Sequence, residues 1–355
     1  MNENDWQQIG RAIKRDPAQR GLLSAPEIAT TVTGELRAAA HDLADRAVAV
    51  ALVTGFCVCT PDGRWVGETD GPPGAMFLAR ALAELGIDVR LISDQHTIAL
   101  LEIGCDHWGL PRSWIETFPF ESADPADPSR VFNGPHSQQK SDDWVEAFFS
   151  GPFGRRLTHI IAIERAGPSH TRASVSNQPG ASNLSRSHFL EEVSPESRNL
   201  CHSMRAISIN AHTAKTHRLF EAAGRRPELT TIGIGDGGNE IGMGNFAWQT
   251  LSRAIAAEHG GKIACRIGTN RAILAGVSDW AAYALAVAVC DLRGRRNLIS
   301  PWSLQSQREL IEVMVRETDA VDGVTARREA TVDGLPLDTY LGALAKLRGI
   351  MGFDP

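Results

Sequence analysis

Residues 47–58 read AVAVALVTGFCV, an apolar and partly β-branched run that Gly55 interrupts. Such a run is typical of a strand buried on both faces of a sheet. The turn GPPG at 71–74 follows, and the pattern predicts a helix over residues 75–85 and another strand over residues 88–93. A strand, a helix and a strand in this order form a parallel pair with a right-handed crossover. This unit predicts an α/β fold.

The rest of the chain repeats the alternation of strands and helices. Further strands are predicted at 159–164, 229–235, 263–267 and 272–275, and further helices at 212–223, 239–259, 279–290 and 303–316. We therefore expect a three-layer α/β fold, in which helices cover both faces of a mostly parallel sheet. Apolar residues at helical spacing predict an N-terminal helical segment over residues 1–46, and we assign residues 47–355 to one α/β domain.

The composition is that of an ordinary globular protein and excludes several classes of function. The 355 residues carry 36 Lys and Arg against 42 Asp and Glu, a net charge of −6, without a basic block that could bind nucleic acid. The apolar stretch at 281–290 is about half the ~20 residues that a membrane span needs. We find no export signal, and six cysteines without a Cys-x-x-Cys pair indicate neither a zinc site nor a disulfide framework. We expect a cytoplasmic protein that acts on a small molecule, with no nucleic acid and no membrane as partner; a homo-oligomer stays open.

Residues 233–245 read GIGDGGNEIGMGN, with six glycines in the twelve residues 233–244 directly after a predicted strand. Glycine lets a backbone turn tightly and approach a ligand closely. Asp236, Asn239 and Glu240 are placed at the carboxyl end of this strand, where open α/β sheets bind their ligands. A glycine-rich turn with solvated acids is the alternative, but a plain turn does not need six glycines. Carboxylates on such a loop suit a cation or an ammonium group better than a phosphate.

The same loop contains the pattern G-x-G-x-x-G, at Gly233, Gly235 and Gly238, so a dinucleotide site has to be weighed. Glu240 is predicted in the first turn of the following helix, where a pyrophosphate needs bare N–H groups and no rival anion. The next predicted strand, 263–267, ends in Arg-Ile-Gly without an acid for the ribose. Because that Arg would suit a 2′-phosphate, an NAD(P)-dependent oxidoreductase stays an alternative, but we expect no nucleotide cofactor.

A second acidic segment, Glu68-Thr-Asp70-Gly-Pro-Pro-Gly, lies between the first strand and its helix. An Asp at this place is equally well explained as a helix N-cap and as a binding residue, so both interpretations of Asp70 stay open. Glu68 has no such capping role. Ser278 precedes the apolar helix predicted over residues 279–290, and we interpret it as the N-cap of that helix.

Glu164 and Arg165 stand at the end of the predicted strand 159–164. The pair could be a surface ion pair, which contributes little to stability. At this end of a sheet, however, an arginine more often binds a carboxylate with two parallel hydrogen bonds. Arg205, just before a predicted helix, is a weaker basic candidate for the same task.

Together these segments resemble the D-glutamate cyclase family, whose domain stands alone in bacteria and forms the C-terminal part of a larger vertebrate enzyme. The matching stretches are 54–56, 68–75, 164–165, 233–244, 275–279, 283–285, 322–325 and 332–336. The resemblance extends from about residue 50 to about residue 345, and its most specific parts are the long and compositionally unusual stretches 68–74 and 233–244.

The resemblance implies a hydro-lyase that closes D-glutamate, or a close analogue, to 5-oxo-D-proline with loss of water. Such a reaction needs a general base for the amine and acid or Lewis-acid help for the departing oxygen. Asp236 and Glu240 are then candidates for the base or for ligands of a divalent cation, Mn²⁺ or Mg²⁺. Asn239 would orient them, and Glu68 would complete the catalytic group.

The same reaction also needs groups that bind the substrate's ammonium, its carboxylate and the oxyanion. The candidates are Asp70, Glu164, Arg165, Arg205, Gly235, Gly237, Gly238 and Ser278. Asp70, like Glu68, would complete the acidic cluster or bind the substrate ammonium. Arg165 or Arg205 would bind the carboxylate, and N–H groups of the glycine loop would bind the oxyanion. A protein that binds an acidic amino acid without catalysis would use the same Arg and the same loop, and it stays a second alternative.

One region departs from the family pattern. Family members commonly follow the Glu-Arg pair with a short Asp-Gly-x-Tyr-x-Asn segment, whereas this chain has Gly167-Pro-Ser-His-Thr-Arg and a long insertion up to Cys201. A related Asn-Met-Arg-Gly pattern appears here as Ser203-Met-Arg-Ala206. If this loop lines the pocket, we expect a preference for another amino acid or lactam, or a loss of activity.

Overall fold

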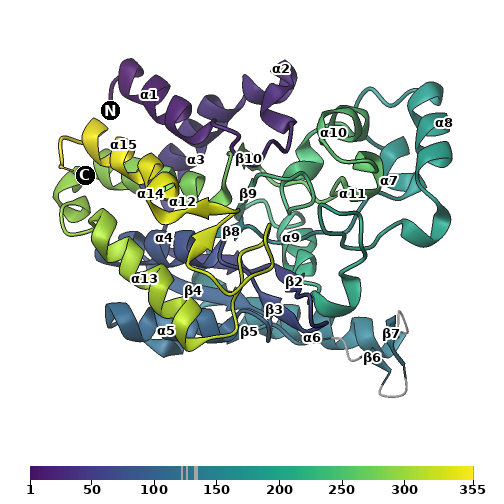
Figure 1. Ribbon diagram of the computed structural model, residues 1–355, viewed down its shortest axis with the longest axis horizontal. Helices are drawn as coiled ribbons and strands as arrows, with labels where there is room; N and C mark the ends of the chain where they lie inside the picture. Colours follow the sequence, from purple (N-terminus) through teal and green to yellow (C-terminus); the bar gives the residue numbers. More distant parts are fainter. Residues whose placement is uncertain (121–122, 125–126, 132–134, 355) are drawn as a thin grey trace.

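The computed structural model describes residues 1–120, 123–124, 127–131 and 135–354, and it is built around one sheet of six parallel strands (Figure 1). The strands stand in the order β10-β9-β8-β1-β4-β5. Their bounds are β1 Ala49–Thr54, β4 Asp88–Ser93, β5 Ile115–Thr117, β8 His159–Ile163, β9 Thr230–Gly235 and β10 Arg271–Leu274.

The strand order contains a topological switch between β1 and β8. The chain starts at β1, adds β4 and β5 on one side, and returns to add β8, β9 and β10 on the other side. In the register of the sheet Thr54 pairs with Ile163, and Ile163 pairs with Ile234. The carboxyl ends of β1, β8 and β9 therefore lie next to one another, at the place where doubly wound sheets bind ligands.

Helices cover both faces of the sheet, which confirms the predicted three-layer α/β fold. Helices α3, α4 and α12 pack on one face, and α9 with α6 packs on the other. The helices are α1 Glu3–Ile13, α2 Pro26–Ala29, α3 Val32–Arg46, α4 Pro72–Glu84, α5 Ile98–Trp108, α6 Pro135–Ser150, α7 Arg172–Ser176, α8 Asn183–Glu192, α9 His217–Ala223, α10 Trp248–Ala254, α11 Gly260–Ile263, α12 Ser278–Leu292, α13 Leu304–Glu317, α14 Leu337–Tyr340 and α15 Gly342–Ile350.

Short strands pair two by two outside the central sheet. They are β2 Cys57–Cys59 with β3 Trp65–Gly67, β6 Ala123–Asp124 with β7 Asp127–Val131, and β11 Thr331–Val332 with β12 Leu335–Pro336. The pair β2–β3 continues the chain beyond β1 and Gly55, so the break predicted at this glycine separates two strands.

The N-terminal helices pack into the same apolar core as the rest of the chain. Helix α1 lies against α15 near the C-terminus, and α3 lies against α12 and β10. Helix α12 is consequently buried almost all round, as its uniformly apolar sequence predicts. Within the described residues, none of the helices combines the length and the apolar character that crossing a bilayer requires.

Two predicted elements are wrong, and both follow the glycine loop. The strand predicted at 263–267 is absent: Gly260–Ile263 is a short helix, and Cys265 forms only an isolated bridge with Ser169. The helix predicted at 239–259 is restricted to Trp248–Ala254, so Glu240 does not lie in a helical turn. The apolar side chains that suggested regular structure are buried in loop conformations, because neighbouring loops supply their backbone hydrogen bonds.

Candidate active site

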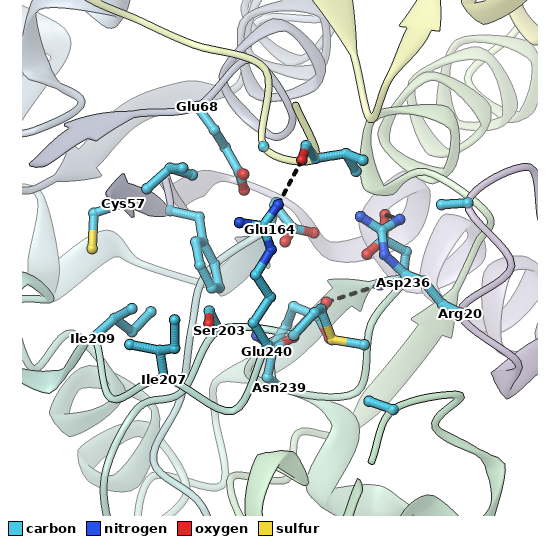
Figure 2. A pocket seen from close by; sticks show the side chains of 18 of the residues that line it. Arg20, Cys57, Glu68, Glu164, Ser203, Ile207, Ile209, Asp236, Asn239 and Glu240 are labelled. Atoms are coloured by element: carbon cyan, nitrogen blue, oxygen red, sulfur yellow. Dashed lines mark hydrogen bonds and ion pairs between the residues drawn. The ribbon is translucent and has the colours of Figure 1, made fainter. Parts of the chain in front are cut away.

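A pocket of about 260 Å³ opens at the topological switch of the sheet (Figure 2). Its walls come from the ends of three neighbouring strands: Phe56 follows β1, Glu164 follows β8, and Asp236 follows β9. Glu68, after β3, closes it from the side. The volume is below the roughly 300–1,000 Å³ of pockets for drug-sized ligands, so the pocket fits a small molecule.

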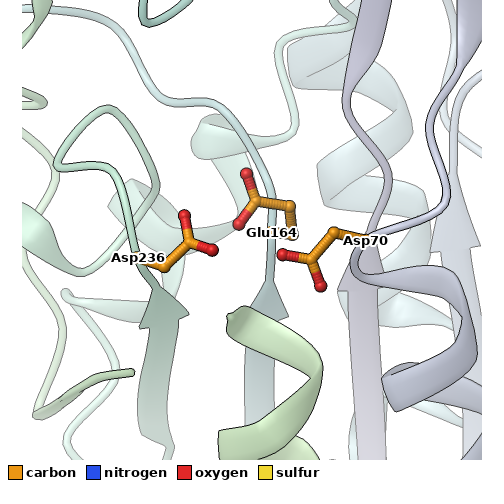
Figure 3. Close-up of side chains that lie close together, drawn as sticks. All are labelled: Asp70, Glu164 and Asp236. Carbon is orange, nitrogen blue, oxygen red and sulfur yellow. The ribbon is translucent and has the colours of Figure 1, made fainter. Parts of the chain in front are cut away.

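Three buried carboxylates converge beside this pocket. Asp70, Glu164 and Asp236 each offer an oxygen, and the three oxygens lie within 4.8 Å of one another (Figure 3). Burial raises the pKa of all three carboxyl groups well above the usual range, and other nearby carboxylates raise them further. Such a cluster of acids gains from a cation that neutralises it.

The donor set of this triad fits a hard divalent cation. Carboxylate oxygens are the ligands that Mg²⁺ and Mn²⁺ prefer. Asp236 Oδ1 is buried and has no hydrogen-bond partner among the residues that the structure describes, so it is available as a ligand. From the sequence, Asp236 and Glu240 are the candidate cation ligands; the structure brings the oxygens of Asp236, Asp70 and Glu164 together, and the carboxylate of Glu240 lies within its own loop.

Asp70 is held by an exchange of caps between two helices. Its Oδ1 and Oδ2 accept hydrogen bonds from the backbone N–H groups of Asp279 (3.0 Å) and Ser278 (3.1 Å) at the start of α12. In return, Asp279 Oδ1 accepts from Gly71 N (2.9 Å) and Gly74 N (2.7 Å) at the start of α4. Asp70 Oδ1 also accepts from Gly71 N at 2.9 Å, next to the start of its own helix. Of the two interpretations left open from the sequence, the capping role is present, but its main bonds go to the partner helix, and the exchange locks α4 against α12.

Glu164 occupies a strained position at the end of β8. Its φ is +43°, in the left-handed region that costs a non-glycine residue of the order of 1 kcal/mol. Ser278 Oγ donates a 2.6 Å hydrogen bond to Glu164 Oε2. The residue at the N-cap of α12 is Val277, so the prediction of Ser278 as the N-cap is wrong by one position, and its hydroxyl instead orients a carboxylate of the triad.

Glu68 is the pocket carboxyl group for which the described residues offer no hydrogen-bond partner. It is buried, lines the pocket, and forms no side-chain hydrogen bond with any residue in the described part of the chain. Burial raises its pKa well above the usual range, and the charge of Glu164 adds to this effect. The turn beyond it needs Gly323, because a Cβ there would lie 2.0 Å from Glu68 Oε2. A buried acid with a raised pKa can hold a proton and pass it on.

Glu240, by contrast, is enclosed by its own loop. Its carboxylate accepts hydrogen bonds from the backbone N–H groups of Gly237 (2.7 Å), Gly238 (2.8 Å) and Asp236 (3.3 Å). A Cβ on Gly235 would lie 2.6 Å from Glu240 Oε2, so that glycine makes room for the carboxylate. The N–H groups expected to hold an oxyanion or a pyrophosphate are thus bonded to Glu240.

Asn239 presents its amide oxygen to the pocket. Its Nδ2 donates to His202 O at 2.8 Å, which fixes the orientation of the amide. Oδ1 is buried and has no partner among the described residues. An acceptor held in this way can bind the N–H of an amine.

The two arginines chosen from the sequence lie in different environments. Arg165 is buried and donates to Asp94 Oδ2 (2.6 Å) and to Thr216 Oγ1, Gly55 O and Ala214 O, so its guanidinium is engaged inside the protein. Arg205 is exposed at the mouth of the pocket and donates one bond, to Val324 O at 3.0 Å. Arg205 is therefore the one of the two that can reach a ligand.

Arg20 is a pocket residue that the sequence did not reveal. It stands after α1, and its guanidinium donates to Asp236 Oδ2 (2.7 Å) and to both oxygens of Asp333 (2.7 and 2.9 Å). Asp333, at φ +55°, lies in the turn that an Asp-Gly pair predicts, but its carboxylate faces Arg20. Neither residue has a sequence signal for this role, because the pairing joins segments 313 positions apart.

Comparison with known proteins connects this site to a family. Residues 9–181 and 176–348 match the family described as D-glutamate cyclase-like, C-terminal. The chain belongs to this family. The human protein named D-glutamate cyclase, mitochondrial, is 28% identical over 305 residues, which cover 79% of this chain and 42% of the human protein. The chain therefore spans less than half the length of this D-glutamate cyclase relative, and the resemblance predicted from the acidic stretches is confirmed at the level of the family.

Proposed function

We propose that the protein is a hydro-lyase that closes D-glutamate, or a close analogue, to 5-oxo-D-proline with loss of water. The observation that carries the proposal is Glu68, a buried carboxyl group that has no hydrogen-bond partner among the described residues and lies in a small pocket beside the acidic triad. Family membership and the printed name of the human relative support the choice of reaction.

The proton balance of this reaction needs one residue that can carry protons. The ammonium group of D-glutamate becomes a lactam N–H and loses two protons, while the γ-carboxylate loses one oxygen and gains the new C–N bond. Both protons end on the departing oxygen, which leaves as water. Glu68 takes a proton from the ammonium and delivers it to this oxygen, and its raised pKa suits both halves of the transfer.

The remaining groups of the pocket position the substrate. Asn239 Oδ1 accepts a hydrogen bond from the amine, and Arg205 at the mouth attracts the α-carboxylate. Holding the amine and the carbon of the γ-carboxylate at attacking distance converts the closure into an oriented intramolecular step. Orientation of this kind supplies about 7–11 kcal/mol in the best cases, so positioning carries much of the rate.

Asp70, Glu164 and Asp236 would hold a divalent cation, Mg²⁺ or Mn²⁺. When bound, the cation supplies Lewis-acid polarisation of a carboxylate oxygen. The pocket holds more acids than bases, and the substrate itself carries two carboxylates and one ammonium, a net charge of −1. Neutralisation of the triad therefore lowers the repulsion that a second carboxylate of the substrate meets.

The test is incubation of the purified protein with D-glutamate and, separately, L-glutamate, with Mn²⁺, with Mg²⁺ or with a chelator. Chiral chromatography detects 5-oxo-D-proline. We expect product from D-glutamate, more with a divalent cation, and a weaker cation response in Asp236→Asn than in Glu258→Gln, a control whose side chain is 90% exposed. Absence of 5-oxoproline under every condition would refute the proposal.

A further inference from the structure

The acidic triad is bonded to a cation of the chain itself, the guanidinium of Arg20. Nη1 of Arg20 donates to Asp236 Oδ2 at 2.7 Å, and Figure 2 shows the two side chains next to each other at the pocket. The arginine side chain is only 13% exposed. Its positive charge counteracts part of the rise in the pKa of Asp236, Glu164 and Glu68. Arg20 therefore belongs to the charge balance of the whole acidic group.

The segment that carries Arg20 is fixed at several points. Arg20 N and Gly21 N donate to the two carboxylate oxygens of Asp16, at 3.0 and 2.9 Å. Ala256 N, from the segment after α10, donates to Arg20 O at 2.8 Å. Gly21 has φ +89°, and a Cβ on it would lie 2.4 Å from Ala254 O, so this close turn requires a glycine. The guanidinium is thus delivered to the triad from a constrained backbone.

Asp333 shares the guanidinium with Asp236. Both oxygens of Asp333 accept hydrogen bonds from Arg20, at 2.7 and 2.9 Å, in the two-pronged geometry that arginine forms with a carboxylate. The negative charge of Asp333 acts against that of the arginine, because it raises the pKa of Asp236 and Glu164. Asp333 therefore reduces the positive charge that the triad receives from Arg20.

Asp236 keeps one of its oxygens free of Arg20. Oδ2 accepts the bond from the guanidinium, whereas Oδ1 is buried and has no hydrogen-bond partner in the described part of the chain. One carboxylate can thus contact Arg20 through Oδ2 and a cation through Oδ1. Two positive charges on one buried carboxylate repel each other, and each weakens the attraction that the other feels.

We infer that Arg20 tunes the affinity of the triad for a divalent cation, because it neutralises part of the negative charge that attracts the cation, and that Asp333 limits this effect. The inference rests on the proposed function in one respect, since it takes Asp70, Glu164 and Asp236 as the cation site. It adds that the triad binds a cation more weakly than three carboxylates without an arginine would.

The probe is Mn²⁺ alone, and its Kd for the metal-depleted protein is measured by electron paramagnetic resonance of the free ion. In Arg20→Met we expect the Kd to fall by about tenfold, because a positive charge beside the site is removed. In Asp333→Asn the guanidinium acts on the triad without its counter-charge, so the Kd should rise by about tenfold.

Two further variants serve as controls for charge and for position. Arg20→Lys keeps the positive charge and should change the Kd by less than about threefold, although lysine lacks the forked geometry. Arg11→Met removes an exposed arginine of α1 that does not line the pocket, and it should leave the Kd unchanged. A tenfold fall in Arg11→Met would show that the net charge of the protein, and not Arg20, sets the affinity.

The opposite signs expected for the two main variants separate this role from a structural one. If Arg20 and Asp333 served only to order the pocket, both substitutions would weaken the binding of Mn²⁺. Where circular dichroism shows that Arg20→Met is unfolded, the double variant Arg20→Met/Asp333→Asn is compared with Asp333→Asn. These two proteins differ at Arg20 alone, and the double variant should bind Mn²⁺ more tightly.

Formation of 5-oxo-D-proline decides the proposed function separately. Product together with unchanged or weaker Mn²⁺ binding on loss of Arg20 overturns the inference and leaves the proposed reaction intact. The expected order of Kd values without product under any condition supports the inference and refutes the proposed reaction. Absence of Mn²⁺ binding in both the unmodified protein and Arg20→Met also overturns the inference.

Discussion

Two buried glutamates in one pocket differ in what surrounds their carboxyl groups. Glu240, in the loop after β9, accepts three backbone N–H hydrogen bonds. Glu68, after β3, accepts none from any described residue, although it is buried and faces the same pocket. The loop around Glu240 has the more unusual sequence, but the carboxylate of Glu240 serves to hold the loop together.

The difference teaches that a buried carboxylate is free to carry a proton where the fold leaves it without donors. Three N–H partners fix the position of a buried carboxylate. Burial without partners leaves the acid ready to hold or release a proton. We therefore assign proton transfer to Glu68 and stabilisation of the loop to Glu240. The predictions that follow test this contrast.

The largest expected effect is on activity. Glu68→Gln keeps the size of the side chain and removes its proton transfer, so we expect kcat for D-glutamate closure to fall by about 10²–10⁴-fold. The melting temperature should stay unchanged or rise slightly, because a buried unpaired acid is replaced by a neutral group. Circular dichroism and a 5-oxo-D-proline assay check both parts. Substantial activity in this variant would remove Glu68 from the mechanism.

The two candidate arginines differ in the same way, since Arg165 is engaged inside the protein and Arg205 is exposed at the pocket. Arg165→Met leaves Asp94 buried without its cation, and removal of one partner of a buried pair costs about 3–5 kcal/mol. We expect that loss in the free energy of unfolding in urea. Arg205→Ala at the pocket mouth should leave stability unchanged and raise KM. If Arg165→Met unfolds with the same free energy as the unmodified protein, Arg165 again becomes a candidate for binding the ligand.

Glu240→Gln tests the structural half of the comparison. A glutamine has one acceptor oxygen for three N–H groups, and each buried N–H left without an acceptor costs about 1–3 kcal/mol. We expect urea unfolding to show a loss in this range, with kcat of the folded protein lowered less than tenfold. Unchanged stability together with abolished turnover would reverse the roles of the two glutamates.

His170 is a buried, partner-poor group outside the pocket, and we expect it to affect stability alone. Burial lowers its pKa from 6.5 to about 4, and the charge of Arg266 contributes. Between these values the unfolded chain binds the proton and the folded protein does not. The free energy of unfolding should therefore rise from pH 4 to pH 6.5, by up to about 1.4 kcal/mol per pH unit for this histidine. Urea titrations of His170→Gln should show a shallower rise across the same window.

The smallest expected effect concerns the turn that carries Ile207. The backbone of Ala206 at φ +55° is strained by about 1–2 kcal/mol, and a glycine at this position removes the strain. Glycine also loses more backbone entropy on folding, which costs about 0.5–1 kcal/mol. We expect Ala206→Gly to stabilise the protein by about 0.5 kcal/mol in thermal unfolding. Ala173→Gly, inside helix α7, is the control and should destabilise it by a similar amount. Destabilisation by Ala206→Gly would show that the turn is not strained.

Regular elements with a clear period were predictable. The apolar strands β1, β4, β8, β9 and β10 and the helices α4, α12 and α13 appear close to their expected residues. The errors fall between residues 239 and 267, where buried apolar residues stand in loops. Periodicity detects burial, but it does not tell whether a backbone hydrogen bond goes to a ladder or to another loop.

The sequence by itself determined the α/β fold, the family, and the presence of acids at the ends of neighbouring strands, because these depend on patterns local to each segment. Tertiary structure alone decided which acids converge and which are neutralised. Asp70 meets Glu164 and Asp236 through the switch between β1 and β8, and Arg20 reaches Asp333 across the chain. Glu68 is left without a donor from the part of the chain that the structure describes. The physical reason is that a side chain's availability depends on burial and on the groups that surround it, and these come from segments far apart in the sequence.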